Sequence, residues 1–469
     1  MNNPNKKGAT QILAHWAATT PMQWSPRVIE IAEHSLEDTI ASAIAGAGDI
    51  GAAAVRASFH SDGRVPLIGG LSCASAPLAA LANGTAAHSR ELDEMFLAAG
   101  SHFGCAVIPA ILSIADELDA SLDRVLDALI VGTEVMARVG IAMDRAHFEK
   151  GWHGTQTIGV IAAAAACGRL LGLTSESMVH AISLAVSMAA GPKIQFGTNV
   201  KPVHAGLAAQ GGVLAASMAA AGVQGSEQAL EGRYGFGEMY AGNKPADWST
   251  IERVGHEPLV MESHGLSFKF YPNCASTHRC LDALRAILDE HKFSLDDVQQ
   301  VETLVGRVNM VNLQYPDPKD SREAMFSMQY GIATLLRFGM VSLSDFTPRA
   351  VNDAKTRGLM GMVSMRLDPR AENDIETATN LLPHTTIVTL KNGQRFVHEL
   401  QHAKGTMQNP FTREERRIKF DQCTRNILPV DRIAQLHEIL SKPRNVKVRS
   451  LMSLLQFEAG SDDGSRFCH

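Results

Sequence analysis

The sequence predicts a mainly α fold, in which both chain ends form a large all-helical domain and a smaller α+β lid domain is inserted between them. Three observations lead to this prediction. Apolar residues recur at helical spacing through the first half of the 469-residue chain. Strand-like alternation begins only after Gly265, and helical spacing returns after Gly405. We therefore expect the helical domain over 1–264 and 403–469, and the lid domain over 265–402.

The first half is expected to form a series of helices. Their expected ranges are Val28–Ala45, Cys105–Leu118, Leu122–Ala142, Glu176–Ala190 and His204–Gly222. Ser121 and Thr174 are suitable N-caps for two of them, and Asp123 falls in a first turn, where a negative charge is favourable. The most apolar run, Ile158–Leu173, is interrupted by Arg169 and is expected to be a buried helix too short to cross a bilayer.

The stretch assigned to the lid domain mixes strand and helix signals. Val301–Val308 alternates like a strand, whereas Ser321–Phe338 has helical spacing that ends at Gly339. His384–Leu400 consists of two β-rich arms around the Asn-Gly pair at 392–393. That pair predicts a hairpin with a type I′ turn, because both residues tolerate positive φ angles.

Helix signals resume in the last part of the chain. Thr412 and Glu415 form a T-x-x-E capping box ahead of a helix that runs through Phe420. Ile433–Leu440 predicts one more helix, and the final residues 461–469 are expected to fray.

Composition and charge narrow the class of function. The net charge of -6 provides no basic field for nucleic acid or for an acidic membrane surface. No apolar core segment follows the N-terminal MNNPNKKGATQ, so we expect no signal peptide. The 7 cysteines are scattered and odd in number, which favours reduced thiols and a cytoplasmic protein.

Sequence motifs of the common cofactors do not occur. Gly232–Gly242 is rich in glycine but lacks the strand-then-helix setting of a dinucleotide site. There is neither a G-x-x-x-x-G-K-[ST] phosphate loop nor a G-x-S-x-G nucleophile elbow. Cys274, His278 and Cys280 lie close together in sequence but lack a second pair of ligands. We therefore predict no cofactor and no metal.

Polar side chains capable of chemistry gather beside glycine or proline in four segments. These are RELDEMFLAAGSHFG (Arg90–Gly104), GWHGTQTIG (Gly151–Gly159), FGTNVKPVHAG (Phe196–Gly206) and FKFYPNCASTH (Phe268–His278). Each also has a purely structural interpretation: an acidic loop, a capping histidine, a surface lysine or a small buried cysteine. Interpreted functionally, they supply the candidate residues Glu91, Asp93, His102, His153, Thr155, Lys201, Lys269, Tyr271 and Cys274.

In this order, the four segments resemble those of the MmgE/PrpD family. The resemblance extends to YPNCASTH, AMFSMQYGIA and GTMQNPFT and covers most of the chain. It implies a helical domain built from both chain ends, an inserted α+β lid, an active site between them, a homodimer, and neither metal nor organic cofactor. Carried over by motif, the acidic position of the family is Glu91 or Asp93, and the other positions are His102, His153, Lys201 and Lys269.

Members of this family include 2-methylcitrate dehydratase, cis-aconitate decarboxylase and iminodisuccinate epimerase. The resemblance therefore implies an enzyme that removes a proton alpha to a carboxylate of a small di- or tricarboxylate. We expect a hydro-lyase similar to 2-methylcitrate dehydratase, with an epimerase of the iminodisuccinate type as the alternative. The decarboxylase is less favoured, because it has histidine at the place of Cys274. A catalytically silent carboxylate-binding homologue is a further alternative.

Removal of such a proton places negative charge on the carboxylate oxygens. Preorganised cations and N–H donors must stabilise that charge if no metal does so. We assign Lys201 and Lys269 to the carboxylates of the substrate, and Thr155 and Tyr271 to substrate binding.

Proton removal also needs a base whose pKa lies near the working pH. The ordinary pKa of histidine is about 6.5, so His153 or His102 is the leading candidate. An epimerase needs a second group on the opposite face of the carbon. Cys274 would fit that role if Lys269 or Arg279 lowered the pKa of its thiol.

Overall fold

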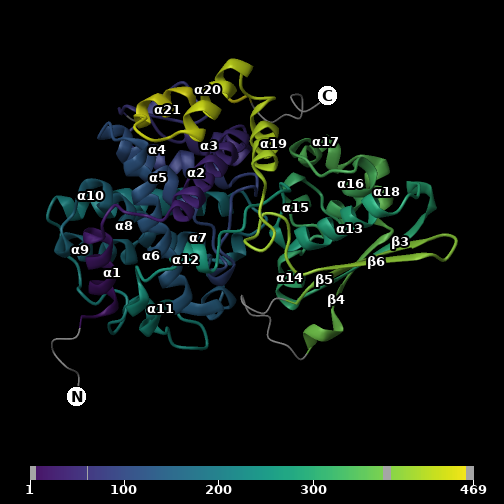
Figure 1. Ribbon diagram of the computed structural model, residues 1–469, viewed down its shortest axis with the longest axis horizontal. Helices are drawn as coiled ribbons and strands as arrows, with labels where there is room; N and C mark the ends of the chain where they lie inside the picture. The colour runs from purple at the N-terminus through teal and green to yellow at the C-terminus, as the bar shows by residue number, and fades with distance from the viewer. Residues whose placement is uncertain (1–6, 61, 373–381, 461–469) are drawn as a thin grey trace. The chain divides into compact units, whose positions relative to one another are not determined.

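The computed structural model describes residues 7–60, 62–372 and 382–460, and helices dominate it (Figure 1). This confirms the predicted mainly α fold. The chain forms two compact units. The first contains the described residues of 7–89, 93–266 and 423–460, and the second contains 90–92 and the described residues of 267–422. The predicted limits were 264 and 402, and the short segment Arg90–Leu92 was not expected to separate from its neighbours.

The first unit is almost entirely helical. Its longer helices are α1 (Ala9–Thr19), α2 (Pro26–Gly46), α3 (Ile50–Ala57), α4 (Ala76–His88), α5 (Gly104–Glu117), α6 (Leu122–Glu149), α8 (Gly159–Leu171), α9 (Ser175–Ser187), α10 (Val200–Ala220), α20 (Val430–Ser441) and α21 (Val448–Leu454). Short helices are α7 (Gly154–Thr157), α11 (Phe236–Tyr240) and α12 (Val260–Ser263), and the two-residue strands β1 (Val65–Pro66) and β2 (Cys73–Ala74) pair antiparallel. All of the helices predicted for the first half are confirmed.

Small residues allow α4 and α10 to lie in close contact. A side-chain carbon added at Gly206 of α10 would lie 2.2 Å from the carbonyl oxygen of Leu81 in α4. One added at Gly84 of α4 would lie 3.0 Å from the Cα atom of Gly206. At Gly206 only glycine permits this backbone approach. The contact positions the C-terminal end of α4 and the first turns of α10, where the functional side chains described below are found.

The predicted helix caps are confirmed in part. The Thr174 hydroxyl accepts a hydrogen bond from the backbone N–H of Ser177, as expected for an N-cap. Ser121 occupies the N-cap position of α6, but its side chain makes no capping hydrogen bond. Helix α6 runs past the predicted end at residue 142, and Asp144 interrupts it with a φ of 55°.

Two helical windows of the described chain, Gly154–Leu171 and Val200–Ala220, have the length and apolar composition of membrane spans. The prediction that the first of these is too short was wrong, because the helical stretch begins before Ile158. Its predicted burial is confirmed, since 89% of the Gly154–Leu171 window is buried inside the protein.

The second unit combines a four-stranded sheet with helices. The strands are β3 (Val298–Val305), β4 (Val363–Leu367), β5 (His384–Leu390) and β6 (Arg395–Leu400), in the order β4-β3-β5-β6. β3 and β4 are parallel, and the other two pairs are antiparallel. The helices are α13 (His278–Glu290), α14 (Arg307–Asn312), α15 (Ser321–Ala324), α16 (Met328–Phe338), α17 (Pro348–Val351), α18 (Ala354–Met360) and α19 (Arg413–Thr424).

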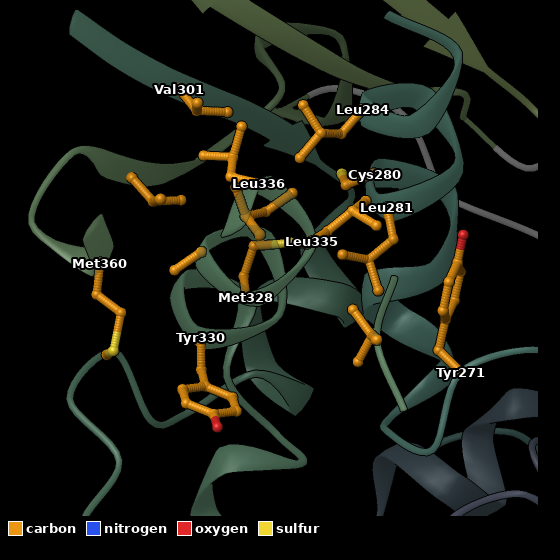
Figure 2. Close-up of a cluster of buried hydrophobic side chains, with 14 of the residues drawn as sticks. Tyr271, Cys280, Leu281, Leu284, Val301, Met328, Tyr330, Leu335, Leu336 and Met360 are labelled. Atoms are coloured by element: carbon orange, nitrogen blue, oxygen red, sulfur yellow. The ribbon is translucent and has the colours of Figure 1, made fainter. Parts of the chain in front are cut away.

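The core of this unit lies where α13 and α16 pack against the sheet. Leu281 and Leu284 from α13, Met328 and Leu335 from α16, and Val301 from β3 gather there, all fully or almost fully buried (Figure 2). Helix α13 begins immediately after the FKFYPNCASTH segment, so this core fixes the end of that segment.

Two local predictions in the second unit need correction. The hairpin is present, but residues 391–394 link β5 to β6, and only Gly393 of the pair at 392–393 has a positive φ. The turn is therefore not type I′, which requires positive φ at both central residues. The predicted helix Ser321–Phe338 is broken between α15 and α16, where the Ser327 hydroxyl caps α16 by accepting from the Tyr330 N–H.

Other local predictions hold. Gly339 ends α16 with a φ of 71°, and Thr412 and Glu415 exchange both hydrogen bonds of a capping box before α19. The expected helix at Ile433–Leu440 lies within α20. The 6 cysteines of the described chain are free thiols. The expected fraying of 461–469, and the thiol of Cys468, lie outside the described residues.

Candidate active site

Four buried imidazoles in the first unit form what we call the histidine cluster: His88, His102, His153 and His204. Ring centroids lie 4.6 Å apart for His88 and His102, 5.8 Å for His88 and His153, and 5.3 Å for His153 and His204. His88 ends α4, His102 precedes α5, His153 precedes α7, and His204 lies early in α10. Three segments that are far apart in sequence therefore meet here.

Asp93 is the anion of the cluster. Its carboxylate oxygens lie 2.9 and 3.0 Å from Nδ1 of His88, and one of them lies 3.1 Å from Nδ1 of His102. Burial alone would raise the pKa of Asp93, but attraction and hydrogen bonds from the two histidines outweigh it and hold this pKa well below its ordinary value. Asp93 is therefore an ionised, fully buried acceptor.

The hydrogen bonds around His102 select its tautomer. Nδ1 faces two acceptors, the Asp93 carboxylate at 3.1 Å and the backbone carbonyl oxygen of Glu94 at 3.1 Å. Since neither acceptor can donate a proton, the neutral ring carries its hydrogen on Nδ1 and its lone pair on Nε2. The Thr155 hydroxyl accepts from the backbone N–H of His102 at 3.0 Å, which fixes the position of that residue. His102 thus has the arrangement of an oriented general base.

His153 and His204 form a neutral pair. Their Nδ1 atoms lie 3.0 Å apart, so one of them donates and the other accepts. Burial, followed by repulsion from Lys201, lowers the pKa of His204 to about 4 and the pKa of His153 well below its ordinary value. Both rings are uncharged at neutral pH, which suits His153 to hydrogen bonding rather than to strong base catalysis.

Lys201 brings a positive charge to the same cluster. It is 3% exposed and lies in the first turn of α10, with its ammonium 5.3 Å from the ring centre of Phe196. Its charge contributes to the lowered pKa values of His88, His153 and His204. The structure therefore brings together the predicted residues Asp93, His102, His153, Thr155 and Lys201.

Two imidazoles of the cluster, His88 and His204, were not predicted as site residues. His204 lies three residues after Lys201 in α10, a spacing that places both side chains on one helix face and that could have identified it. His88 precedes the acidic segment and ends a helix of small residues, so nothing local distinguishes it from a capping side chain.

His88, Asp93 and Cys105 are all of metal-ligating types, and their ligand atoms lie within 4.8 Å of one another. Burial, and then the neighbouring Asp93, raises the pKa of the Cys105 thiol well above its ordinary value, so the sulfur keeps its proton. The imidazole hydrogens also face Asp93. We therefore interpret the group as a hydrogen-bonded network centred on Asp93.

Glu94 is a neutral neighbour of the cluster. It is fully buried, and its carboxyl accepts a hydrogen bond from the Ser35 hydroxyl at 2.6 Å. Burial, and then repulsion from Asp38, raises the pKa of Glu94 to about 8. Glu94 is therefore largely protonated at neutral pH, which leaves Asp93 as the ionised carboxylate of this segment.

Replacement of Glu94 by glutamine is expected to change how stability depends on pH. The ordinary pKa of glutamate is 4.5 and that of folded Glu94 is about 8, so between these values only the folded state keeps the proton. The stabilising contribution of Glu94 is complete below pH about 4.5 and declines as pH rises towards about 8. The urea midpoint of Glu94→Gln should therefore rise relative to that of wild type as the pH increases from about 5 to about 8. A constant difference between the two proteins would contradict the raised pKa.

A second group of chemically capable side chains lies in the second unit, which we call the strap cluster: Glu91, Lys269, Cys274 and His278. The Lys269 ammonium and the Glu91 carboxylate lie 3.0 Å apart, and both side chains are 2% exposed. Glu91 has a φ of 54°, a strained conformation for a residue other than glycine. Glu91 precedes Asp93 by two residues in the chain, yet it belongs to the other compact unit.

The protonation of Cys274 differs from the sequence prediction. Burial, and then the Glu91 charge, raises the pKa of its thiol, and the opposing effect of Lys269 is smaller. The expectation that Lys269 or Arg279 lowers this pKa below its ordinary value was therefore wrong, because burial and then the nearby Glu91 charge outweigh the effect of Lys269. Cys274 keeps its hydrogen at neutral pH and is a proton donor rather than a thiolate. Burial, with Lys269, also lowers the pKa of His278 to about 3.

Tyr271 and Lys419 have contacts that the sequence did not indicate. The Tyr271 hydroxyl donates to the Asp282 carboxylate at 2.8 Å, and its ring belongs to the core of the second unit (Figure 2). This hydrogen bond anchors the segment to α13, and the substrate contact of Tyr271 stays a prediction. Lys419 of α19 is buried and donates to the backbone carbonyl oxygen of Leu92 at 2.8 Å.

Comparisons with known proteins agree with the motif order. A family model described as the MmgE/PrpD N-terminal domain matches residues 11–249, and one described as the MmgE/PrpD C-terminal domain matches 271–442. The chain is 29% identical over 388 residues to cis-aconitate decarboxylase of Homo sapiens, which covers 80% of this chain and 78% of the relative. It is 25% identical over 476 residues to cis-aconitate decarboxylase of Aspergillus terreus, which covers 96% of each.

Proposed function

Because the chain belongs to the MmgE/PrpD family, we propose that it is a lyase that removes a proton from the carbon beside a carboxylate of a small di- or tricarboxylate. The observation that supports this most strongly is the arrangement of His102. Asp93 and the Glu94 carbonyl hold its proton on Nδ1, which leaves Nε2 as a base in a cluster that also contains Lys201.

In the proposed first step, Nε2 of His102 takes the proton and the C–H electron pair moves towards the carboxylate carbon. The Lys201 ammonium stabilises the charge that develops on the carboxylate oxygens. Neutral His153 supplies a hydrogen bond without adding charge, because its lowered pKa keeps it uncharged. Asp93 stabilises the imidazolium formed on His102.

We propose dehydration as the reaction that follows, with a substrate of the 2-methylcitrate type. The carbanion electrons form the C=C bond, the adjacent C–O bond breaks, and the departing hydroxyl takes a proton to leave as water. Histidinium at His102 holds one proton that can complete this step. Dehydration needs only the removal of a proton and the return of one, and no other reactant.

Decarboxylation of cis-aconitate is the second candidate. Its support is that the relatives reported above carry the name cis-aconitate decarboxylase. Loss of CO₂ also leaves a carbanion that cations must stabilise, so Lys201 suits both reactions. Cys274 stands where the decarboxylase is expected to carry histidine, which is why we place dehydration first.

A product assay tests the proposal. The protein is incubated with 2-methylcitrate, citrate, cis-aconitate or iminodisuccinate, while alkene absorbance, released CO₂ and optical rotation are followed. Growth of alkene absorbance from 2-methylcitrate or citrate supports dehydration. CO₂ from cis-aconitate supports the second candidate, and a change of rotation with iminodisuccinate alone supports an epimerase. No conversion of any of the four would contradict an enzymatic function on these acids.

The role of Cys274 is tested by comparison with a second buried cysteine. Cys274→Ala is expected to lower kcat/KM by about 10²-fold, since it removes a protonated thiol able to deliver a proton. The control is Cys280→Ala, whose sulfur lies 3.9 Å from Nδ1 of His384 in the core of the second unit. It should affect stability more than rate. Near-wild-type rates for both variants would show that the Cys274 thiol delivers no proton in the reaction.

We also propose that the protein is a homodimer, as its family resemblance implies. One face of α10 leaves three apolar side chains partly exposed at intervals of seven residues: Val200 at 42%, Leu207 at 38% and Leu214 at 37%. A heptad spacing keeps them on one side of the helix, which is the pattern of a helix that packs against another.

Charges placed in this face are expected to separate the dimer. Leu207→Asp combined with Leu214→Asp should shift the mass measured by light scattering from that of a dimer to that of a monomer. Dimerisation would bury the two aspartate carboxylates away from water, which is costly. Val430→Asp is the control, since Val430 of α20 is 84% exposed and outside this face. A wild-type protein that is monomeric at micromolar concentration would contradict the proposal.

A further inference from the structure

His88 has one ring nitrogen in use and one without a partner. It is the last residue of α4 and is fully buried. Nδ1 lies 3.0 and 2.9 Å from the two carboxylate oxygens of Asp93. In the part of the chain that the structure describes, Nε2 is buried and no hydrogen-bonding group reaches it. Buried polar atoms without a partner are rare in native proteins and need an explanation.

The chemistry of Asp93 decides what kind of partner Nε2 lacks. Asp93 is ionised and can only accept, so the hydrogen of His88 must lie on Nδ1. Burial lowers the pKa of His88 to about 4, so the ring carries only that one hydrogen at neutral pH. Nε2 is therefore a lone-pair acceptor, and its missing partner must be a donor.

The position of this acceptor connects it with the proposed reaction. The His88 ring lies 4.6 Å from the ring of His102 and 5.8 Å from that of His153, between centroids. The acceptor thus belongs to the same cluster as the proposed base. A ligand that fills this cluster with ionised carboxylates alone would leave the acceptor unsatisfied.

We propose that Nε2 of His88 accepts a hydrogen bond from a hydroxyl group of the substrate, and that the site therefore selects hydroxy-di- or tricarboxylates over carboxylates that lack a hydroxyl. This inference rests on the proposed function and narrows its substrate class. Ionised citrate and 2-methylcitrate each have a single donor, the hydroxyl. Ionised cis-aconitate has none. His88 would then favour the dehydration substrate and disfavour the decarboxylation substrate.

Binding of a matched pair of ligands tests the inference. Citrate and tricarballylate differ only by the hydroxyl, and their affinities can be measured by titration calorimetry in the His102→Asn background, where turnover does not consume citrate. EDTA is present throughout. Citrate is expected to bind about tenfold more tightly than tricarballylate, as one buried hydrogen bond would give.

Two variants of His88 test whether the difference in affinity between citrate and tricarballylate arises from Nε2. The amide of His88→Asn can replace Nδ1–H towards Asp93 but offers no acceptor at the place of Nε2, so the citrate preference should vanish through weaker citrate binding. The side-chain oxygen of His88→Gln can replace Nε2, so that variant should keep part of the preference. Loss of affinity for both ligands alike in His88→Asn would overturn the inference.

Four further results of the binding measurements would overturn the inference. Equal binding of the two ligands by the protein with His88 intact would show that a water occupies the acceptor, and it would overturn the inference while leaving the proposed function in place. Binding of neither would overturn both. A citrate preference that appears only when Zn²⁺ replaces EDTA would assign His88, Asp93 and Cys105 to a metal instead. Tighter binding of iminodisuccinate than of citrate would overturn the assignment to a hydroxyl.

Discussion

His102→Asn is expected to lower kcat/KM by about 10³-fold while the protein stays folded. The asparagine amide can still donate to Asp93 and to the Glu94 carbonyl, as Nδ1 does in the wild type. What disappears is Nε2, the atom to which the mechanism assigns proton removal. A positioned general base contributes about 10²–10⁴-fold to a rate, and the expected loss lies in that range. Steady-state kinetics on the substrate found by the product assay measures it.

His147→Asn is the matched control for this variant. His147 is also a buried imidazole of the first unit, but both of its nitrogens are used in structural hydrogen bonds, to the Tyr240 carbonyl at 2.9 Å and to the Thr157 hydroxyl at 2.7 Å. This variant should lower the urea midpoint and leave kcat/KM per folded molecule within a few fold. If the two variants lost activity equally, His102 would have no special role.

Lys269→Met is expected to destabilise the protein by about 3–5 kcal/mol, because it leaves the Glu91 carboxylate buried without its cation. The two charged groups lie 3.0 Å apart and are 2% exposed each, so water cannot replace the lost partner. Urea denaturation of wild type and variant measures the effect.

A double variant distinguishes the loss of the ion pair from the cost of leaving one of its two charges buried. Lys269→Met combined with Glu91→Gln should recover much of the lost stability, because it removes the buried negative charge together with the cation. Lys404→Met is the surface control: Lys404 and Glu415 lie 2.9 Å apart but are 26% and 30% exposed, and an exposed pair contributes about 0–1 kcal/mol. Equal losses of unfolding free energy for Lys404→Met and Lys269→Met would contradict the claim that burial makes the Lys269–Glu91 pair more important for stability.

Local features of the fold could be predicted from the sequence because they depend on neighbouring residues. The Thr174 cap and the Thr412–Glu415 capping box are set by hydrogen bonds within one turn of helix, and both are confirmed. The turn at residues 392–393 was predicted wrongly. Its type depends on how the paired strands end, and the two-residue Asn-Gly pattern does not contain that information.

The sequence predicted only those residues of the candidate site that lie in the motif segments. Asp93, His102, His153 and Lys201 stand in chemically dense segments, and the structure places them in one cluster. His88 and Cys105 join that cluster through contacts with Asp93, and no pattern in their own segments marks them. Such contacts arise from packing of separate helices, which periodicity does not reveal.

The protonation state of Cys274 shows a different limit of sequence reasoning. A lysine five residues away suggested a lowered pKa, whereas the structure pairs that lysine with Glu91, a residue 178 positions distant in sequence. Burial raises the pKa of the thiol most, the Glu91 charge raises it further, and the lysine opposes both with a smaller effect. The sign of this pKa shift is thus set first by burial and then by a charged partner that is close only in space, and the local sequence shows neither.

Release of deuterium to water is the most direct test of the central claim, that His102 removes a proton beside a substrate carboxylate. Citrate and 2-methylcitrate are labelled with deuterium on the carbons next to their terminal carboxylates, and the label reaching the solvent is measured by mass spectrometry. We predict rapid release with wild type and with His147→Asn, and release at least about 10²-fold slower with His102→Asn. Release by His102→Asn at the wild-type rate would contradict the mechanism.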